Sequence, residues 1–231
     1  MSGVGSAISR ELLELGLIRL GISTSESGCE KDKVCDKLYR YLREVERWNR
    51  RFNLVRADGK DLVVRHLLDS LSVYRFLADK RKNLDLLDIG SGAGFPGIPL
   101  SVVFPDFRFV LLERMEKKAA FLKNIVFEFG LLNVKVVCDD LKNLSSRKSF
   151  YDVVTFRAFS KLEKILGFVI PLLNDNGFIM AYKGKLDTLK EEISALSVFF
   201  KHMEINRVSV PFMEAERHIL VAKKKDYFGR S

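Results

Sequence analysis

A short apolar segment that runs directly into a cluster of glycines constrains the fold of this chain more than any other feature. Residues 84–89 are apolar except for two aspartates, which is typical of a buried strand, and four of the next eight residues are glycine. A helix is predicted at about 97–103. Glycines between a strand and a helix allow a tight turn and let a ligand approach the backbone closely. The segment therefore predicts a ligand-binding loop in an α/β fold.

The C-terminal part of the chain, residues 81–231, has a pattern of strands that alternate with helices. Further strands are predicted at about 107–112, 133–138, 151–156 and 177–182, and helices at about 115–129, 161–172 and 186–200. Two last strands, at about 203–210 and 217–223, are joined by too few residues for a crossover helix, so we expect them to pair antiparallel at one edge. The pattern predicts a Rossmann-like seven-stranded sheet, mainly parallel, with helices on both faces.

Residues 1–80 are predicted as a basic helical N-terminal extension, with helices at about 6–20, 30–50 and 60–78. The chain has 39 Lys and Arg against 30 Asp and Glu, a net charge of +9. Residues 31–82 alone have 15 basic and 8 acidic residues, a net charge of +7. This concentration favours a polyanionic partner such as a nucleic acid. The alternative is that the basic side chains only keep the protein soluble.

Composition excludes several classes of protein. The chain is 47% hydrophobic and 30% charged, so we expect it to be globular rather than disordered. No apolar run reaches the roughly 20 residues that a membrane helix needs, and no secretory signal is recognised, which favours a cytoplasmic protein without a membrane partner. The cysteines Cys29, Cys35 and Cys138 form no Cys-x-x-Cys pair, so neither a disulfide framework nor a metal site is predicted.

Two carboxylates refine the prediction for the glycine loop. Asp88 stands at the end of the first predicted strand, where its charge would repel a pyrophosphate and attract a cationic, amine-bearing ligand. Glu113 ends the next predicted strand, 21 residues after Gly92, where it can accept hydrogen bonds from ribose hydroxyls. A positively charged nucleoside such as S-adenosylmethionine fits both. A dinucleotide is the alternative, and a P-loop is excluded because no Gly-Lys-Ser/Thr follows.

The sequence after the fourth predicted strand narrows the choice of methyl-accepting group. Residues 155–159 lack the Asn/Asp-Pro-Pro-aromatic motif that serves exocyclic amines of bases, and Cys138 is misplaced as a nucleophile for cytosine C5. A ring nitrogen such as guanine N7 has a free lone pair, so it needs alignment and electrostatics but no general base. One alternative is a methyltransferase for a small molecule or protein, which the +7 stretch disfavours. The other is an RNA-binding module with a vestigial loop, which would also lack a catalytic dyad.

From about residue 39 to about residue 223, the chain resembles the RsmG (GidB) family of bacterial methyltransferases of small-subunit ribosomal RNA. The motifs that carry the resemblance are Trp48-Asn49 with Asn53-Leu54, His66 with Asp69-Ser70, the loop at 88–100, Arg157-Ala158-Phe159, Lys183-Gly184 and Glu216-Arg217-His218. The resemblance implies a class I S-adenosylmethionine-dependent methyltransferase. It also implies that the acceptor is N7 of a guanine in the conserved decoding-region loop of 16S rRNA.

The resemblance implies cofactor-binding roles for Gly90, Phe95, Leu141, Lys142 and Arg157. Together with the glycine-loop argument and the basic stretch, it gives the following expectations. The expected cofactor-binding residues are Asp88, Gly90, Gly92, Gly94, Phe95, Glu113, Asp140, Leu141, Lys142 and Arg157. Arg157 and Lys183 are expected to be catalytic, by holding guanine O6 or nearby phosphates. The expected RNA-binding residues are Arg47, Arg50, Arg51, Arg65, His66 and Lys183. The expected partner is 16S rRNA or a precursor of the small ribosomal subunit, and the protein is expected to be a monomer.

Some polar and aromatic residues keep two interpretations. His66, on an apolar helix face, is either a core histidine bonded to Asp69 or backbone, or part of an RNA-facing cleft. Trp48 either packs in the core or stacks on a base. Asn49 and Asn53 are four residues apart and are expected to share a helix face, either bracing the next loop or facing the cleft.

Overall fold

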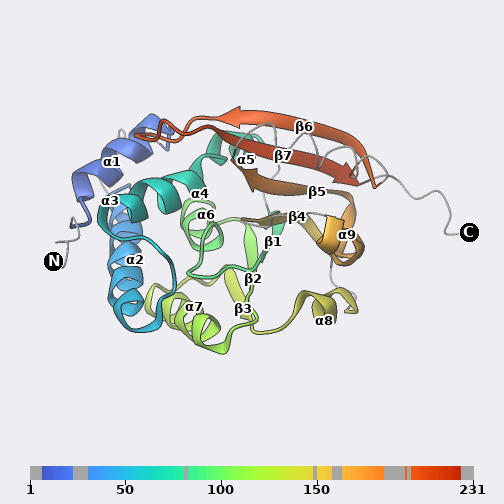
Figure 1. The fold of residues 1–231 in the computed structure, drawn as a ribbon, viewed down its shortest axis with the longest axis horizontal. Coiled ribbons are helices and arrows are strands. Elements are labelled where there is room, and N and C mark those ends of the chain that lie inside the picture. The colour runs from blue at the N-terminus through green and yellow to red at the C-terminus, as the bar shows by residue number, and fades with distance from the viewer. Residues whose placement is uncertain are drawn as a thin grey trace, which may run out of the picture.

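The computed structural model describes residues 7–22, 31–80, 83–147, 150–157, 163–184, 196 and 199–224. Within these residues a seven-stranded sheet has the strand order β3-β2-β1-β4-β5-β7-β6 (Figure 1). The strands are β1 (Asp85–Ile89), β2 (Arg108–Leu112), β3 (Val134–Val137), β4 (Tyr151–Phe156), β5 (Leu173–Lys183), β6 (Phe200–Val208) and β7 (Arg217–Lys224). The seven predicted strands are therefore all present, although β5 begins four residues earlier than expected.

The sheet is parallel from β3 to β5 and antiparallel at the other end. β1 pairs in parallel with β2 and β4, and β7 pairs antiparallel with both β5 and β6. The predicted antiparallel pairing of the last two strands is confirmed, with β6 at the edge. All residues of β4 are buried, as expected for a parallel strand covered on both faces. The carboxyl ends of the parallel strands thus meet at one edge, where α/β folds bind ligands.

Helices cover both faces of the sheet. They are α1 (Arg10–Arg19), α2 (Lys31–Phe52), α6 (Gly97–Val103), α7 (Glu116–Glu128), α8 (Leu141–Ser145) and α9 (Glu163–Val169), which continues into the 3-10 turn η2 (Ile170–Leu172). The prediction missed α8. The helix predicted at 186–200 lies mostly outside the described residues, and Phe200 belongs to β6 instead.

The helix predicted at 60–78 is divided into four pieces. These are α3 (Gly59–Asp61), the π-helix η1 (Leu62–Leu68), α4 (Asp69–Leu71) and α5 (Tyr74–Ala78). The break before α5 falls at Ser72 and Val73, where Val73 has φ −88° and ψ 3°, outside the helical region. A π-helix is wider than an α-helix and is frequently found at functional sites. The wider turn therefore changes which side chains of this segment share a face.

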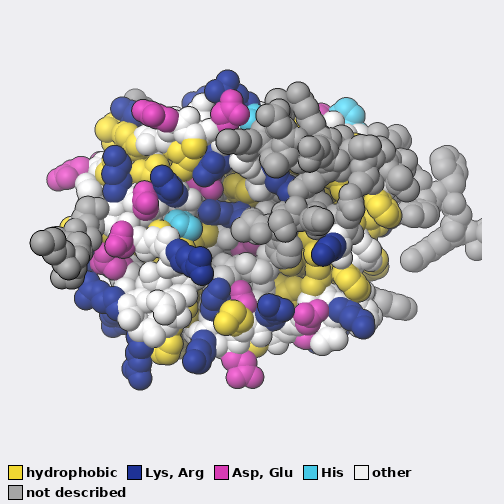
Figure 2. Space-filling model, viewed as in Figure 1, with side chains coloured by type: hydrophobic (Ala, Val, Ile, Leu, Met, Phe, Trp, Pro, Cys, Tyr) yellow, Lys and Arg dark blue, Asp and Glu magenta, His cyan; other side chains and the backbone are white. Residues whose placement is uncertain are grey.

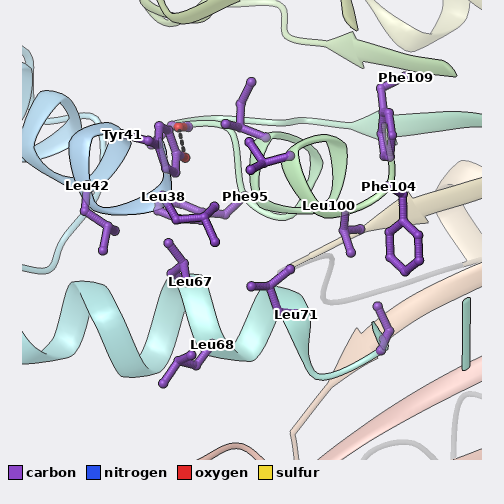
Figure 3. Packing of buried hydrophobic residues seen from close by; sticks show 14 of the residues in the cluster. Leu38, Tyr41, Leu42, Leu67, Leu68, Leu71, Phe95, Leu100, Phe104 and Phe109 are labelled. Atoms are coloured by element: carbon purple, nitrogen blue, oxygen red, sulfur yellow. Dashed lines mark hydrogen bonds between the residues drawn. The ribbon is translucent and has the colours of Figure 1, made fainter. Parts of the chain in front are cut away.

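One hydrophobic core joins the N-terminal helices to the sheet. Leu38 and Leu42 of α2 and Leu67 of η1 belong to the same buried cluster as Phe95 and Leu100, which follow β1 (Figure 3). A second cluster lies on the opposite face and includes residues of α8 and α9. The described part of the N-terminal extension thus packs directly on the sheet and shares its core.

Trp48 contributes to this packing. Its ring centroid lies 5.3 Å from that of Phe52 and 5.4 Å from that of Phe121 in α7. These contacts support core packing over base stacking for Trp48. No helix among the described residues is long and apolar enough to cross a membrane.

Candidate functional site

The glycine loop between β1 and α6 has a backbone that suits glycine at three places. Gly90, Gly92 and Gly94 have φ of 70°, 60° and 99°, in the left-handed region that other residues rarely adopt. A Cβ on Gly94 would lie 2.7 Å from Ile98 Cγ1, so packing also requires glycine there. A Cβ on Gly92 would meet only the Gly90 carbonyl oxygen, at 3.8 Å. The backbone at Gly92 therefore presents an open face that a ligand can approach.

Asp88 lies beneath this loop. Its side chain is buried, and Oδ2 accepts a hydrogen bond from the Gly97 amide at 3.1 Å. Oδ1 is also buried, and it has no hydrogen-bond partner in the part of the chain that the structure describes. Burial raises the pKa of Asp88 to about 7. An orphaned carboxylate oxygen is the acceptor that a cationic ligand group needs, so the site fits the predicted cationic nucleoside.

Glu113 supports the loop from the end of β2. Its side chain is buried, Oε2 accepts a hydrogen bond from the Gly92 amide at 2.9 Å, and Oε1 accepts one from the Met115 amide at 2.9 Å. Each carboxylate oxygen can accept a second hydrogen bond. Its predicted role toward ribose hydroxyls stays a prediction, and the contacts add that Glu113 braces the loop.

Two aromatic side chains of the N-terminal helices cover the loop. The Tyr41 hydroxyl donates to the Ala93 carbonyl at 2.7 Å, and the Tyr41 ring lies 5.4 Å from that of Phe95 (Figure 3). His66 belongs to η1 rather than α2, and its ring lies 5.3 Å from the Phe95 ring. Sequence reasoning missed Tyr41 because, at helical spacing among apolar residues, it has the pattern of a core residue.

His66 is held in a setting that favours the neutral imidazole. Burial, reinforced by the charge of Arg157, lowers the pKa of His66 to about 4. Its backbone carbonyl accepts hydrogen bonds from Ser70 and Arg157. The Asp69 carboxylate pairs with Arg157 and Arg217, and the His66 ring packs on Phe95.

Arg157, which directly follows β4, is bound to the helical segment of residues 59–78. Its Nη1 donates to Ser70 Oγ at 2.9 Å and to the His66 carbonyl at 3.1 Å, and its Nη2 donates to the Arg65 carbonyl at 3.2 Å. Nη2 also lies 3.2 Å from Asp69 Oδ2. Most N–H groups of this guanidinium are therefore used within the protein.

Several of the sequence motifs meet at the carboxyl edge of the parallel strands. Arg217 Nε donates to Asp69 Oδ1 at 3.2 Å, so the start of β7 is tied to the same carboxylate as Arg157. His218 Nδ1 donates to the Gly184 carbonyl at 2.8 Å, next to Lys183. Lys183 ends β5 and is in register with His218. Segments far apart in the chain thus meet beside the glycine loop.

The last group of expected cofactor-binding residues, Asp140, Leu141 and Lys142, follows β3. Asp140 is the N-cap of α8, and its Oδ1 accepts a hydrogen bond from the Lys142 amide at 2.9 Å. Leu141 is half-buried against the second core cluster, and Lys142 is exposed. All three follow β3 at the carboxyl edge of the sheet, and their contact with the cofactor stays a prediction.

The predicted RNA-binding arginines lie on the helices that pack against the loop. Arg47, Arg50 and Arg51 are exposed near the end of α2, and Arg65 is exposed on η1. Figure 2 shows Lys and Arg side chains over α2 and α7, with acidic side chains between them. Arg47 forms an ion pair with Glu44, and the Arg47 side chain remains 65% exposed.

Asn49 and Asn53 differ from the prediction of a shared helix face. Asn49 braces the loop after α2: its Oδ1 accepts from the Val55 amide at 2.9 Å and its Nδ2 donates to the Ala57 carbonyl at 3.3 Å. Asn53 lies beyond the end of α2 with φ 47°, so it cannot lie on the same helix face. The prediction of a shared helix face was wrong because α2 ends at Phe52, one residue before Asn53.

A separate cavity of about 360 Å³ lies between α1, α5, β6 and β7. Its lining includes Arg19, Arg75 and Arg207 and none of the predicted site residues. Among the described residues, no three His, Cys, Asp or Glu side chains are grouped so that they could hold a metal ion.

A family model described as rRNA small subunit methyltransferase G matches residues 34–220, a range that includes most of α2, the glycine loop and most of the sheet. The chain belongs to this family. Two relatives named ribosomal RNA small subunit methyltransferase G agree with the assignment. The relative from Neisseria meningitidis serogroup B is 36% identical over 217 residues, which cover 94% of this chain and 99% of that protein. The relative from Borrelia hermsii is 38% identical over 213 residues, which cover 91% and 98%.

Solved structures confirm the fold class of this member of the methyltransferase G family. A SAM dependent methyltransferase from Aquifex aeolicus superposes with a TM-score of 0.56 at 16% identity, covering 80% of this chain and 98% of that chain. TYW2 from M. jannaschii, in complex with AdoMet, superposes with a TM-score of 0.51 at 16% identity, covering 69% and 76%. The predicted family and the predicted class I methyltransferase fold are thus both confirmed.

Proposed function

We propose that this methyltransferase G family member transfers a methyl group from S-adenosylmethionine to N7 of a guanine in the decoding-region loop of 16S rRNA. The observation that carries the proposal is the family match, because it spans both the helices that cover the glycine loop and the sheet that positions it. The relatives are named for the small-subunit RNA, and the basic helices of this chain suit such a polyanion.

The residues around the glycine loop suit S-adenosylmethionine. The orphaned Oδ1 of Asp88 would accept from a cationic group, the open face at Gly92 leaves room for the ligand, and Glu113 would accept from the ribose. Asp140, Leu141 and Lys142 would border the adenine. The cofactor, when bound, supplies an electrophilic methyl group. The chain's own task is to hold both reactants in line and to keep water out.

Guanine N7 carries a lone pair and no proton, so the chain needs no general base. Lys183, at the end of β5, is proposed to hold guanine O6 or a neighbouring phosphate. Arg157 is placed at the same edge, but four hydrogen bonds and ion contacts bind it to residues 65–70. These contacts support a positioning role for Arg157, through the helical segment that carries His66, rather than direct contact with the base.

The basic helices are proposed to bind the RNA backbone. Arg47, Arg50, Arg51 and Arg65 are exposed on helices whose inner faces contact the glycine loop or the core beside it. RNA bound along these helices would bring a target guanine toward the carboxyl edge of the sheet. We also propose that the protein acts as a monomer in the cytoplasm.

The proposal is tested by mapping methylated guanines in 16S rRNA from cells that lack the protein and from the same cells complemented with it. We expect one N7-methylguanine of the decoding region to be missing without the protein and restored with it. Purified protein incubated with either deproteinised 16S rRNA or small subunits would show which is the substrate. An unchanged methylation map would contradict the proposal. Calorimetry that detects no S-adenosylmethionine binding would favour an RNA-binding module instead.

A further inference from the structure

We propose that Asp69 is a positioning residue for methyl transfer, which fixes the guanidinium of Arg157 and offsets its charge beside the acceptor base. The inference rests on the proposed function. It concerns a residue to which the sequence analysis gave no role in the reaction. Three observations carry it: the place of Arg157 in the sheet, the sharing of one carboxylate by two arginines, and the direction in which charge moves during the reaction.

The register of the sheet places Arg157 beside the glycine loop. Phe156 is paired with Ile89 on neighbouring parallel strands, so Arg157 and Gly90 leave the sheet at the same level. Neighbouring strands are about 4.8 Å apart. The Arg157 side chain is only 18% exposed, and its Cζ lies 5.9 Å from the centre of the Tyr182 ring. Its charge is therefore fixed in the wall of the site.

Asp69 is placed to offset that charge. Its side chain is 5% exposed, with Oδ2 3.2 Å from Arg157 Nη2 and Oδ1 3.2 Å from Arg217 Nε. Burial raises the pKa of Asp69, and the charges of Arg157 and Arg217 oppose that rise. As a carboxylate shared by two guanidiniums, Asp69 leaves a single net positive charge. Without the carboxylate the two positive charges would stand uncompensated in a poorly solvated place, where charge interactions are stronger than in water.

The proposed reaction moves positive charge toward this cluster. As the bond between N7 and the methyl carbon forms, the bond between sulfur and that carbon breaks, and the positive charge passes from sulfur to the guanine ring. No proton moves. A fixed positive charge near the base opposes this transfer, and a carboxylate that offsets it favours the transfer. Asp69 would therefore act on the chemical step and on the affinity for the cationic product base.

The test compares two substitutions that share one lost contact and change the charge in opposite directions. Asp69→Asn and Arg217→Gln both remove the 3.2 Å ion pair between α4 and β7, and Asp69→Asn also removes the ion pair with Arg157. The first adds one net positive charge to the cluster and the second removes one. The single-turnover methylation rate at saturating cofactor should fall about 10-fold or more in Asp69→Asn and change by less than about 3-fold in Arg217→Gln. The double variant restores the original net charge and should recover most of the rate.

A binding measurement gives a readout without turnover. RNA fragments that carry either guanine or 7-methylguanine at the target position are titrated against each protein in the presence of S-adenosylhomocysteine. Asp69→Asn should weaken binding of the methylated fragment relative to the unmethylated one, and Arg217→Gln should not. Because Asp69→Asn removes two ion pairs, its folding is checked by thermal unfolding. If Asp69→Asn does not fold, the Arg217→Gln variant decides. Weaker binding of methylated RNA relative to unmethylated RNA by Arg217→Gln would overturn the inference.

The outcomes separate the inference from the proposed function. If the wild-type protein is active and both variants lose the methylation rate equally, Asp69 is only a structural link. That result would overturn the inference and leave the proposed function intact. An unchanged rate in Asp69→Asn would do the same. A wild-type protein that does not methylate guanine N7 in rRNA would overturn the proposed function, and the inference with it.

Discussion

The Tyr41 hydroxyl of α2 donates a hydrogen bond to the Ala93 carbonyl of the glycine loop, at 2.7 Å and across 52 residues of sequence. Both residues are buried, and the Tyr41 ring also contacts Phe95 (Figure 3). A buried carbonyl that accepts a hydrogen bond from another element is costly to leave unpaired. The conformation of the glycine loop therefore depends on a helix of the N-terminal extension.

We expect Tyr41→Phe to lower the free energy of unfolding by about 1–3 kcal/mol, because the Ala93 carbonyl loses its buried donor. The same change should weaken S-adenosylmethionine binding, since the loop is less firmly held. Chemical denaturation and calorimetry measure the two effects. Tyr74→Phe serves as a control, because Tyr74 stacks on Phe104 in the same core away from the loop. Unchanged cofactor affinity in Tyr41→Phe would show that α2 does not support the site.

Gly92→Val should abolish cofactor binding while the protein still folds. The valine would enter the open face of the loop and would also strain a backbone with φ 60°. Gly130→Val is a matched control: Gly130 has φ 57° and a Cβ added there would meet nothing within 4 Å, but it follows α7. Both variants should lose similar stability on thermal unfolding, and only Gly92→Val should lose binding by calorimetry. Normal affinity in Gly92→Val would move the pocket elsewhere.

RNA affinity should fall steeply with salt, because phosphate contacts release counterions. Replacing Arg47, Arg50 and Arg51 together by glutamine should flatten this dependence and leave cofactor binding intact. A charge-matched control replaces Arg108, Lys135 and Lys223, which are exposed toward the amino ends of the parallel strands. Filter binding of 16S rRNA fragments over a range of salt concentrations measures the slopes. Equal slopes for both triple variants would place the RNA surface elsewhere, most simply near Lys183.

At saturating cofactor, the single-turnover rate should be nearly flat from about pH 6.5 to about pH 8.5, because the acceptor loses no proton. Burial lowers the pKa of His66 to about 4, so His66 stays neutral throughout this range, and His66→Gln should leave the profile flat. A sharp rise with an apparent pKa near 7 that disappears in His66→Gln would reveal a general base and contradict direct attack.

Cofactor affinity, by contrast, should depend on pH. Burial raises the pKa of Asp88 to about 7, so the side chain loses its proton as the pH rises through that value. A cationic ligand binds the ionised form more tightly, and affinity should therefore increase between about pH 6 and about pH 8. Asp88→Asn should lack this increase. Calorimetry at several pH values tests the prediction, and parallel curves for the two proteins would remove Asp88 from the binding site.

The local elements were largely predictable from sequence. The apolar run before the glycines predicted β1, and the helix expected at about 97–103 is α6 with the same bounds. Both depend on residues that are neighbours in the chain, since alternation, apolar runs and glycine conformation act over a few residues. Even there, limits were visible: the π-helix in η1 was not predicted, because a small shift in backbone geometry leaves little mark on periodicity.

The sequence by itself determined the seven strands and most of the helices, the class of sheet, the glycine loop and the family resemblance. Only the tertiary structure decided which residues meet at the glycine loop and beside it. Asp69 joins Arg157 and Arg217, which are 88 and 148 residues away along the chain, and Tyr41 reaches Ala93 from another helix. No local pattern encodes such pairs, because they form only when the helices are packed on the sheet and water is excluded between them. Burial in that packed state also sets the charge of Asp88 and His66, and hence the chemistry that the site favours.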